Sequence, residues 1–298
     1  MSSAEGARPA SFARRVSGTL YRRPGLRLGG LLTAPLGYLV VVYLGALGLL
    51  LMSAFWTTDE FSGNLVKSFT WANFHAVATT SVYRTVLIRS VGVAAAVTVI
   101  CTAVAFPMAF FMAKVAPVRL RRGLVVAVLT PLWASYLVKA FAWRSMFSGD
   151  GVLDWALTPF GLSSPGFGLP ATVVVLSYLW LPYMILPIYA GLERLPESML
   201  EASADLGAKA GRTFRSVVLP LTIPAVVAGS IFTFSLSLGD YITVQIVGGK
   251  TQLIGNLIQT NVGAANNLPL AAALATLPIV IMVGYLLAVR RTGALDNL

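Results

Sequence analysis

The sequence predicts an all-α membrane protein with six transmembrane helices. Of its 298 residues, 57% are hydrophobic and only 11% are charged, which is too little charge for a soluble domain of this length. The apolar residues form continuous runs of 18 or more, and about 20 such residues cross the roughly 30 Å hydrocarbon layer as a helix. A membrane barrel needs short alternating strands instead. The fold class therefore follows from composition and run length together.

Charged residues and clusters of proline, glycine and asparagine divide the apolar sequence into six expected spans. The third is the least regular, because Lys139 falls inside it. The sixth is separated from the preceding apolar region by the turn signal "NVGAANNLP". The predicted spans are Gly30–Phe55, Ser90–Ala113, Gly123–Trp143, Ala171–Leu192, Val217–Leu238 and Leu268–Val289.

The distribution of Lys and Arg predicts the orientation of these spans. With six spans both ends share one side, and that side carries 16 of the 22 basic residues. The positive-inside rule places it in the cytoplasm. We therefore expect a basic N-terminal tail (1–29), a six-span domain (30–291) with a cytoplasmic loop at 193–216, and a short C-terminal tail (292–298). The net charge of +11 is then explained by the basic residues of the cytoplasmic loops and tails, and nucleic-acid binding is not expected.

The sequence shows no recognisable set of metal-binding, nucleotide-binding or catalytic residues. There is one histidine and one cysteine, which leaves no expected metal cluster, and no glycine-rich phosphate loop or catalytic triad is recognisable. We expect no catalytic residue and no bound cofactor, so any energy source has to come from a partner.

One compact polar segment interrupts this apolar chain, "LERLPESMLEASADLGAKAGRTFRSVVLP", residues 192–220. Pro196 and Glu197 are typical of a helix start. Gly207 is favoured just past a helix end and unfavourable within a helix. We predict a short helix, 196–206, that turns at Gly207, and a second short helix before the fifth span.

The first of these helices carries one small apolar face, formed by Met199, Ala202, Ser203 and Leu206. Glu201 and Asp205 lie one turn apart, where like charges disfavour an isolated helix. A helix that docks in a groove of a partner needs such an apolar face with polar flanks. A solvated loop helix accounts for the same pattern, and the residues alone leave the two interpretations even.

The spacing of this segment resembles a known motif. Glu201-Ala202-Ser203, three residues, Gly207, nine residues and Val217-Val218-Leu219-Pro220 resemble the EAA loop of the membrane subunits of ABC importers. Ser203 and Val217 depart from that pattern by small changes. The resemblance implies that the loop is the coupling helix that lies in a groove of a cytoplasmic ATPase. It assigns Met199, Ala202 and Leu206 to packing, Glu201 and Asp205 to polar contacts, and Gly207 to the turn.

Further stretches, including "PLWASYLVKAFAWRSMFSGDGVLDWAL" and "LPLTIPAVVAGSIFTFSLSLGDYITVQIVGG", look like the spermidine/putrescine branch of these permeases. Permeases for thiamine, opines and aminophosphonates share much of the pattern. The resemblance implies a bacterial inner-membrane importer in which this chain pairs with a second, different permease, an ATPase dimer that uses ATP and Mg²⁺, and an external solute-binding protein.

Candidate residues for the solute path are fewer. A carboxylate beside aromatic rings can hold an ammonium group by charge and by cation–π attraction, and Asp240 stands next to Tyr241 and near Gln245. The alternative is an interfacial Asp240 that pairs with Lys250 or with water. Trp180 and Tyr183 are further candidates, although aromatic residues in spans more often serve packing.

Two other classes of membrane protein compete with the importer. An ion-coupled secondary transporter needs ionisable residues within the membrane or an inverted repeat, and a channel needs a selectivity filter. The sequence shows none of these. We therefore predict an ABC importer permease for a small charged solute, with a polyamine as the first candidate.

Overall fold

The computed structural model describes residue 29 and residues 32–33, 35–59, 63–149 and 151–290. The N-terminal and C-terminal tails expected from the sequence lie almost entirely outside these residues. The chain separates into two compact units, 1–53 and 54–298. The longest continuously described part of the first unit is a helical segment, Pro35–Ser53, long and apolar enough to cross a membrane. It includes a π-helical stretch, η1 (Leu39–Leu44), which is followed by α3 (Gly45–Ser53).

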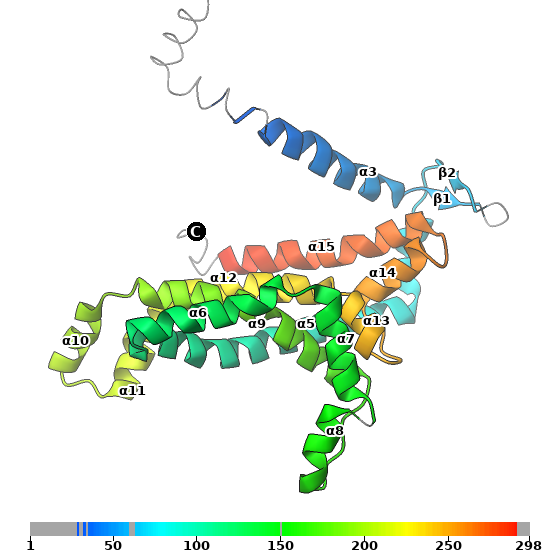
Figure 1. The fold of residues 1–298 in the computed structure, drawn as a ribbon. Helices are drawn as coiled ribbons and strands as arrows, with labels where there is room; N and C mark the ends of the chain where they lie inside the picture. The colour runs from blue at the N-terminus through cyan, green and yellow to red at the C-terminus, as the bar shows by residue number, and fades with distance from the viewer. Residues whose placement is uncertain (1–28, 30–31, 34, 60–62, 150, 291–298) are drawn as a thin grey trace, which may run out of the picture. The chain divides into compact units, whose positions relative to one another are not determined.

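The second unit is built around long helices that run side by side (Figure 1). Each is apolar over most of its length, as expected for helices that satisfy their backbone polar groups internally within a membrane. They are α5 (Ser81–Phe110), which continues into the π-helical turn η2 (Phe111–Val115), α6 (Val118–Trp133), α9 (Leu169–Glu193), α12 (Leu219–Leu238) and α15 (Leu268–Arg290).

Shorter elements gather at the two ends of this bundle (Figure 1). At one end lie α10 (Glu197–Asp205) and α11 (Ala210–Thr213), the latter followed by the π-helical turn η4 (Phe214–Val218). The other end holds the two-residue antiparallel strands β1 (Thr57–Thr58) and β2 (Leu65–Val66), which the all-α prediction did not include. It also holds α4 (Ala72–Thr79), α7 (Tyr136–Phe147), α8 (Val152–Leu157), the 3₁₀ turn η3 (Thr158–Phe160), α13 (Ile242–Val247) and α14 (Ile254–Val262).

Most of the predicted spans are confirmed. In the described residues five helices are long and apolar enough to span a membrane, or six if one bent pair counts as a single span. The second helix begins nine residues earlier than predicted, at Ser81, because charges mark the edge of the apolar run and not the end of the helix. The predicted turn before the sixth span is also confirmed, since α14 ends at Val262 and Asn266 has a φ of 47°.

The third span differs from the prediction of one continuous helix over Gly123–Trp143. The chain bends by 92° between α6 and α7. Ala134 and Ser135 adopt extended backbone angles there. The Lys139 ammonium donates a hydrogen bond to the Pro131 carbonyl across this bend (3.1 Å), so it binds backbone within the chain. A hydropathy sum over the whole stretch is insensitive to a break of this kind.

The fifth span also begins earlier than predicted. The second loop helix, α11, continues through η4 into α12, so that one helical segment runs from Ala210 to Leu238. Pro220 lies where the π-helical turn η4 passes into α12, and it does not separate the loop helix from the span.

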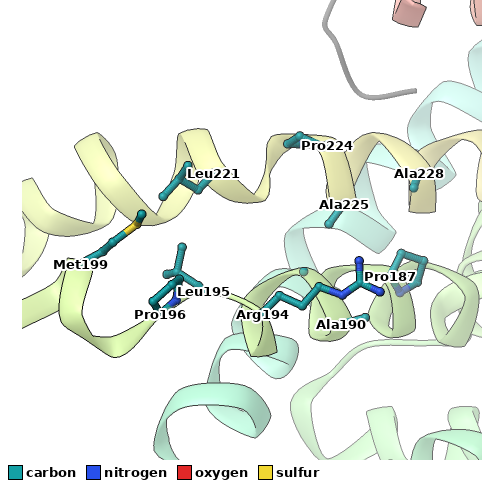
Figure 2. A pocket seen from close by; sticks show the side chains of 11 residues that line it. Pro187, Ala190, Arg194, Leu195, Pro196, Met199, Leu221, Pro224, Ala225 and Ala228 are labelled. Carbon is teal, nitrogen blue, oxygen red and sulfur yellow. The ribbon is translucent and has the colours of Figure 1, made fainter. Parts of the chain in front are cut away.

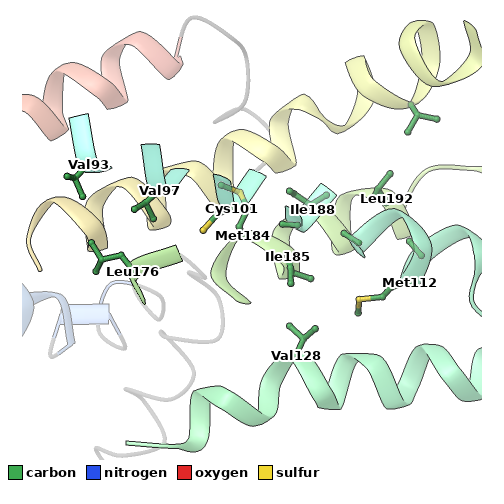
Figure 3. Packing of buried hydrophobic residues seen from close by; sticks show 14 of the residues in the cluster. Val93, Val97, Cys101, Met112, Val128, Leu176, Met184, Ile185, Ile188 and Leu192 are labelled. Atoms are coloured by element: carbon green, nitrogen blue, oxygen red, sulfur yellow. The ribbon is translucent and has the colours of Figure 1, made fainter. Parts of the chain in front are cut away.

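The largest core cluster joins α5 to α9 (Figure 3). Val97 and Cys101 of α5 pack with Leu176 and Met184 of α9. Cys101 is fully buried, as expected for a thiol that acts as a small apolar residue. A Cβ atom built on Gly229 would lie 2.7 Å from Met184 Sδ, so glycine permits the close approach of α12 to α9. This packed core separates the two polar ends of the bundle.

Candidate functional site

The 193–216 loop forms a helix, a turn and a second helix, as predicted. Pro196 precedes α10 in an extended conformation, and Glu197 lies in its first turn. Gly207 has a φ of +77°, a left-handed conformation that glycine adopts without steric cost. Its N–H donates to the Ala204 carbonyl (2.8 Å). The position of Gly207 at the turn is therefore explained by its backbone conformation.

The outward side of α10 exposes apolar side chains at the end of the bundle. Leu206 is 89% exposed and Met199 is 46% exposed. Ala202, Glu201 and Asp205 are exposed as well. Six of the seven residues that the sequence singled out thus lie together on an accessible surface.

Ser203 is the exception, because it does not belong to the outward apolar face. Its hydroxyl is within hydrogen-bond distance of the Thr213 hydroxyl of α11 (2.9 Å), so Ser203 ties the two loop helices together. The partner of Ser203 lies on the next helix, so the periodicity of α10 alone could not predict this contact.

The inward side of the loop anchors it to the bundle through residues that sequence reasoning missed or only partly used. Leu200 of α10 and Phe214 of η4 pack against the main core cluster. The Phe214 ring lies edge-on to Phe106 (5.5 Å between centroids) and to Phe110 (6.1 Å), both on α5. Leu200 stands on the opposite side of α10 from the exposed face, which is the signal that could have identified it.

A hollow of about 490 Å³ opens beside this loop, between α9 and α12 (Figure 2). Met199 of α10 and Arg194 at the end of α9 reach its lining, opposite Leu221 and Pro224 of α12. The exposed Met199 side chain therefore borders both the outward face and this hollow.

Asp240 lies at the other end of the bundle, where α12 gives way to α13. It is only 8% exposed. The Tyr136 hydroxyl donates to one of its oxygens, and the Thr243 N–H donates to the other (2.8 Å). Burial raises the pKa of the Asp240 carboxyl, and the hydrogen bonds from Tyr136 and Thr243 oppose that rise. Among the described residues the partners of Asp240 are thus a tyrosine from α7 and the backbone of α13.

Tyr136, Trp180 and Tyr183 form an aromatic row that begins at the tyrosine bonded to Asp240. The Tyr136 and Trp180 rings lie 5.9 Å apart, and the Trp180 and Tyr183 rings lie 5.8 Å apart. The Trp180 Nε1 is buried and has no hydrogen-bond partner among the residues that the structure describes. Tyr136, 104 residues from Asp240, carries no local signal in the sequence and was missed.

Tyr241 and Gln245 make no ring contact with Tyr136, Trp180 or Tyr183 among the contacts of the described residues. The Tyr241 carbonyl accepts a hydrogen bond from Asn256 Nδ2 of α14 (3.1 Å), and its side chain is half-buried. Gln245 is exposed on α13. Arg144 also turns inward, since its guanidinium donates to the Ile246 carbonyl (2.7 Å) and lies over the Phe167 ring (5.2 Å).

Comparisons with known proteins agree with this architecture. The sequence model of the family described as "Binding-protein-dependent transport system inner membrane component" matches residues 105–292. The chain is 44% identical to the inner membrane ABC transporter permease protein YdcU of Escherichia coli over 299 residues, covering 95% of both chains. It is 31% identical to the spermidine/putrescine transport system permease protein PotB of Haemophilus influenzae, over 72% of this chain and 77% of that one.

The fold is shared with a solved transporter. A chain of the bacterial alginate ABC transporter, crystallised with its alginate pentasaccharide-bound periplasmic protein, superposes with a TM-score of 0.68. The match covers 92% of this chain and 95% of that chain at 14% sequence identity. At that identity the likeness concerns the fold alone.

Proposed function

Because this chain belongs to the binding-protein-dependent transport system inner membrane components, and is thus the permease subunit of an ABC importer, we propose that it carries a small organic cation of the polyamine type. Members of this family are non-catalytic membrane subunits, and ATP is hydrolysed by a separate subunit.

The exposed face of α10 is the observation that supports ATPase docking. A leucine that is 89% exposed at the tip of a polar loop is costly in water and is stabilised when a partner covers it. Met199 and Ala202 widen this apolar face, and Glu201 and Asp205 flank it with negative charge. Such a helix fits an apolar groove with a basic rim.

The orientation follows from charge. Lys114, Arg119, Arg121 and Arg122 lie at the same end of the bundle as the 193–216 loop, and the positive-inside rule assigns that end to the cytoplasm. Both termini then face the cytoplasm, and the end with Asp240 and the small hairpin faces outward. An external solute-binding protein would dock there, and a second permease subunit would complete the path.

A polyamine is the solute that best fits the row of aromatic rings formed by Tyr136, Trp180 and Tyr183. Tyr183 is exposed enough for contact (36%), and tyrosine and tryptophan ring faces attract alkylammonium groups. The buried Asp240 carboxyl behind Tyr136 adds negative potential, with Tyr241 and Gln245 nearby on the α13 side. The similarity to PotB over most of the chain points the same way. Thiamine, an opine or an aminophosphonate are the alternatives within the same importer class.

The decisive experiment reconstitutes the complete importer in nanodiscs and measures ATP hydrolysis with the binding protein loaded with spermidine, putrescine, thiamine or an aminophosphonate. We expect stimulation by the polyamines only. Stimulation by another member of the panel alone would replace the polyamine assignment and leave the importer assignment intact.

Variants of the 193–216 loop test the docking role in the same assay. Gly207→Pro removes a hydrogen-bonded N–H and requires a φ near −65° where the backbone has +77°. Ala210→Pro is the matched control, because it places the same ring at a first helical position after an extended residue, Lys209. Gly207→Pro and the charge reversal Glu201→Lys should abolish stimulation while the chain remains inserted, and Ala210→Pro should retain it. Full stimulation in Gly207→Pro and Glu201→Lys would rule out the docking role.

A further inference from the structure

The corner between α9 and α10 is held by a side chain from another span. The Lys114 ammonium, at the end of the α5–η2 helix, donates a hydrogen bond to the Leu195 carbonyl (2.7 Å). Leu195 lies between the last residue of α9 and Pro196, and its side chain is 7% exposed within the core cluster. The bond therefore joins the second span to the backbone at the point where the loop leaves the bundle.

The Leu195 carbonyl is well placed to fix the angle between α9 and α10. Leu195 follows the end of α9 and precedes α10, so its carbonyl lies between two helices. The next residue is Pro196, whose ring restricts its own φ. A bond from an ammonium to a carbonyl is charge-assisted and stronger than a neutral one. Rotation of α10 about the corner has to displace Lys114 or break this bond.

A second, weaker contact lies on the same corner. Arg121 of α6 approaches Glu193, the last residue of α9, with 3.9 Å between Nη1 and Oε1. The Tyr189 hydroxyl also donates to that Glu193 oxygen (3.1 Å). Glu193 is about half exposed, and exposed ion pairs contribute little. The Lys114 bond is therefore the tighter of the two connections between the 114–122 segment and the corner.

Lys114 differs from Arg119 and Arg122, the two exposed basic residues of its segment, and like Arg121 it is half-buried. Its ammonium lies against the corner. A lysine that served only to mark the cytoplasmic side would keep its ammonium in water. Its burial on a backbone carbonyl 81 residues away requires a different explanation.

We propose that Lys114 is a positioning residue that fixes the angle of α10 against the second span, so that displacement of α10 by the ATPase moves α5 together with α9. The inference rests on the docking role proposed above. In this arrangement the ATPase displaces α10 at its exposed face. The movement is transmitted through the backbone at Leu195 to both α9 and α5. Packing of Phe214 against α5 supports the same pair of spans from the other side of the loop.

The test uses the complete importer with three variants. Lys114→Met keeps the apolar stem and removes the donor, Lys114→Arg keeps a donor, and Arg122→Met removes one charge from an exposed site of the same segment. In Lys114→Met we expect the ATPase subunit to remain bound and basal hydrolysis to be retained, while solute-stimulated hydrolysis falls about fivefold or more. Lys114→Arg and Arg122→Met should stay close to the unmodified complex. Equal stimulation in Lys114→Met and Arg122→Met would overturn the proposal.

A distance measurement tests the positioning role apart from transport. Spin labels at Ser198→Cys on α10 and Val118→Cys on α6, both exposed sites, report the angle of the loop in the full chain, and Cys101 is buried and stays unlabelled. We expect Lys114→Met to broaden or shift the distance distribution and Arg122→Met to leave it unchanged. An unchanged distribution in Lys114→Met would also overturn the proposal. Absence of any stimulation in the unmodified importer would instead count against the proposed function, and the distances would still decide the role of Lys114.

Discussion

The two ends of the bundle treat polar residues in opposite ways. In the 193–216 loop Glu201, Asp205 and the apolar Leu206 are all exposed, so the part of the chain that the structure describes leaves this surface uncovered. At the other end Asp240 is buried and bonded to Tyr136 and Thr243. The role of an acidic residue in this membrane protein therefore depends on its partners. The 193–216 loop presents its carboxylates to another molecule, whereas the Asp240 carboxyl holds helices of the same chain together.

Replacement of the buried acid should have the largest effect on stability. Asp240→Ala leaves the Thr243 N–H without its acceptor and the Tyr136 hydroxyl with the Thr243 hydroxyl as its remaining partner, which costs about 2 kcal/mol for buried donors. Asp205→Ala, the matched change at the exposed end, should stay within about 0.5 kcal/mol. Thermal unfolding of the chain in nanodiscs measures both.

Asp240→Asn sharpens this result, because it keeps the side-chain size and one carbonyl acceptor and should lose less than Asp240→Ala. Equal stability of Asp240→Ala and Asp205→Ala would remove the contrast between the two ends. It would leave Asp240 as a residue of the solute path with no structural role.

The loop was predictable because its signals are local. Pro196, Gly207 and the face of Met199, Ala202 and Leu206 all follow from backbone preferences or helical spacing over a few residues. The resemblance to the EAA motif then supplied the partner. The structure adds the partner of Ser203, Thr213, which lies across the turn, and it joins the second loop helix to the fifth span without a break.

The Asp240 region was predictable only in part, because its contacts are distant in sequence. Tyr136 is 104 residues from Asp240, and Lys114 is 81 residues from Leu195. Neither pair leaves a pattern within one span. The break at Ala134–Ser135, which places Tyr136 at the start of α7, is also hidden from an average of hydropathy over the third span. Local chemistry thus indicated Asp240 but could not show what holds it.

The turn glycine should show an intermediate effect. Gly207→Ala forces a side chain into a left-handed conformation at a cost of about 1 kcal/mol, although a Cβ there meets no atom within 4 Å. Gly211→Ala is the control, because its added Cβ also meets no atom within 4 Å and its backbone is helical, so it should be neutral or slightly stabilising. Hydrogen exchange of the α10 amides measures the difference, and equal protection in the two variants would contradict the strain explanation.

Leu206 should show the smallest effect on stability and the clearest separation of the two roles. Leu206→Ala removes a side chain that is 89% exposed, so the free energy of unfolding of the chain should change by less than about 0.5 kcal/mol. Its inward neighbour Leu200 packs against the core, and Leu200→Ala should cost about 2 kcal/mol. If the exposed face docks, Leu206→Ala should weaken ATPase binding measured in detergent, even though the chain itself is as stable as before. A Leu206→Ala chain that bound the ATPase normally would return this helix to the status of a solvated loop, because nothing else in the described structure covers its apolar face.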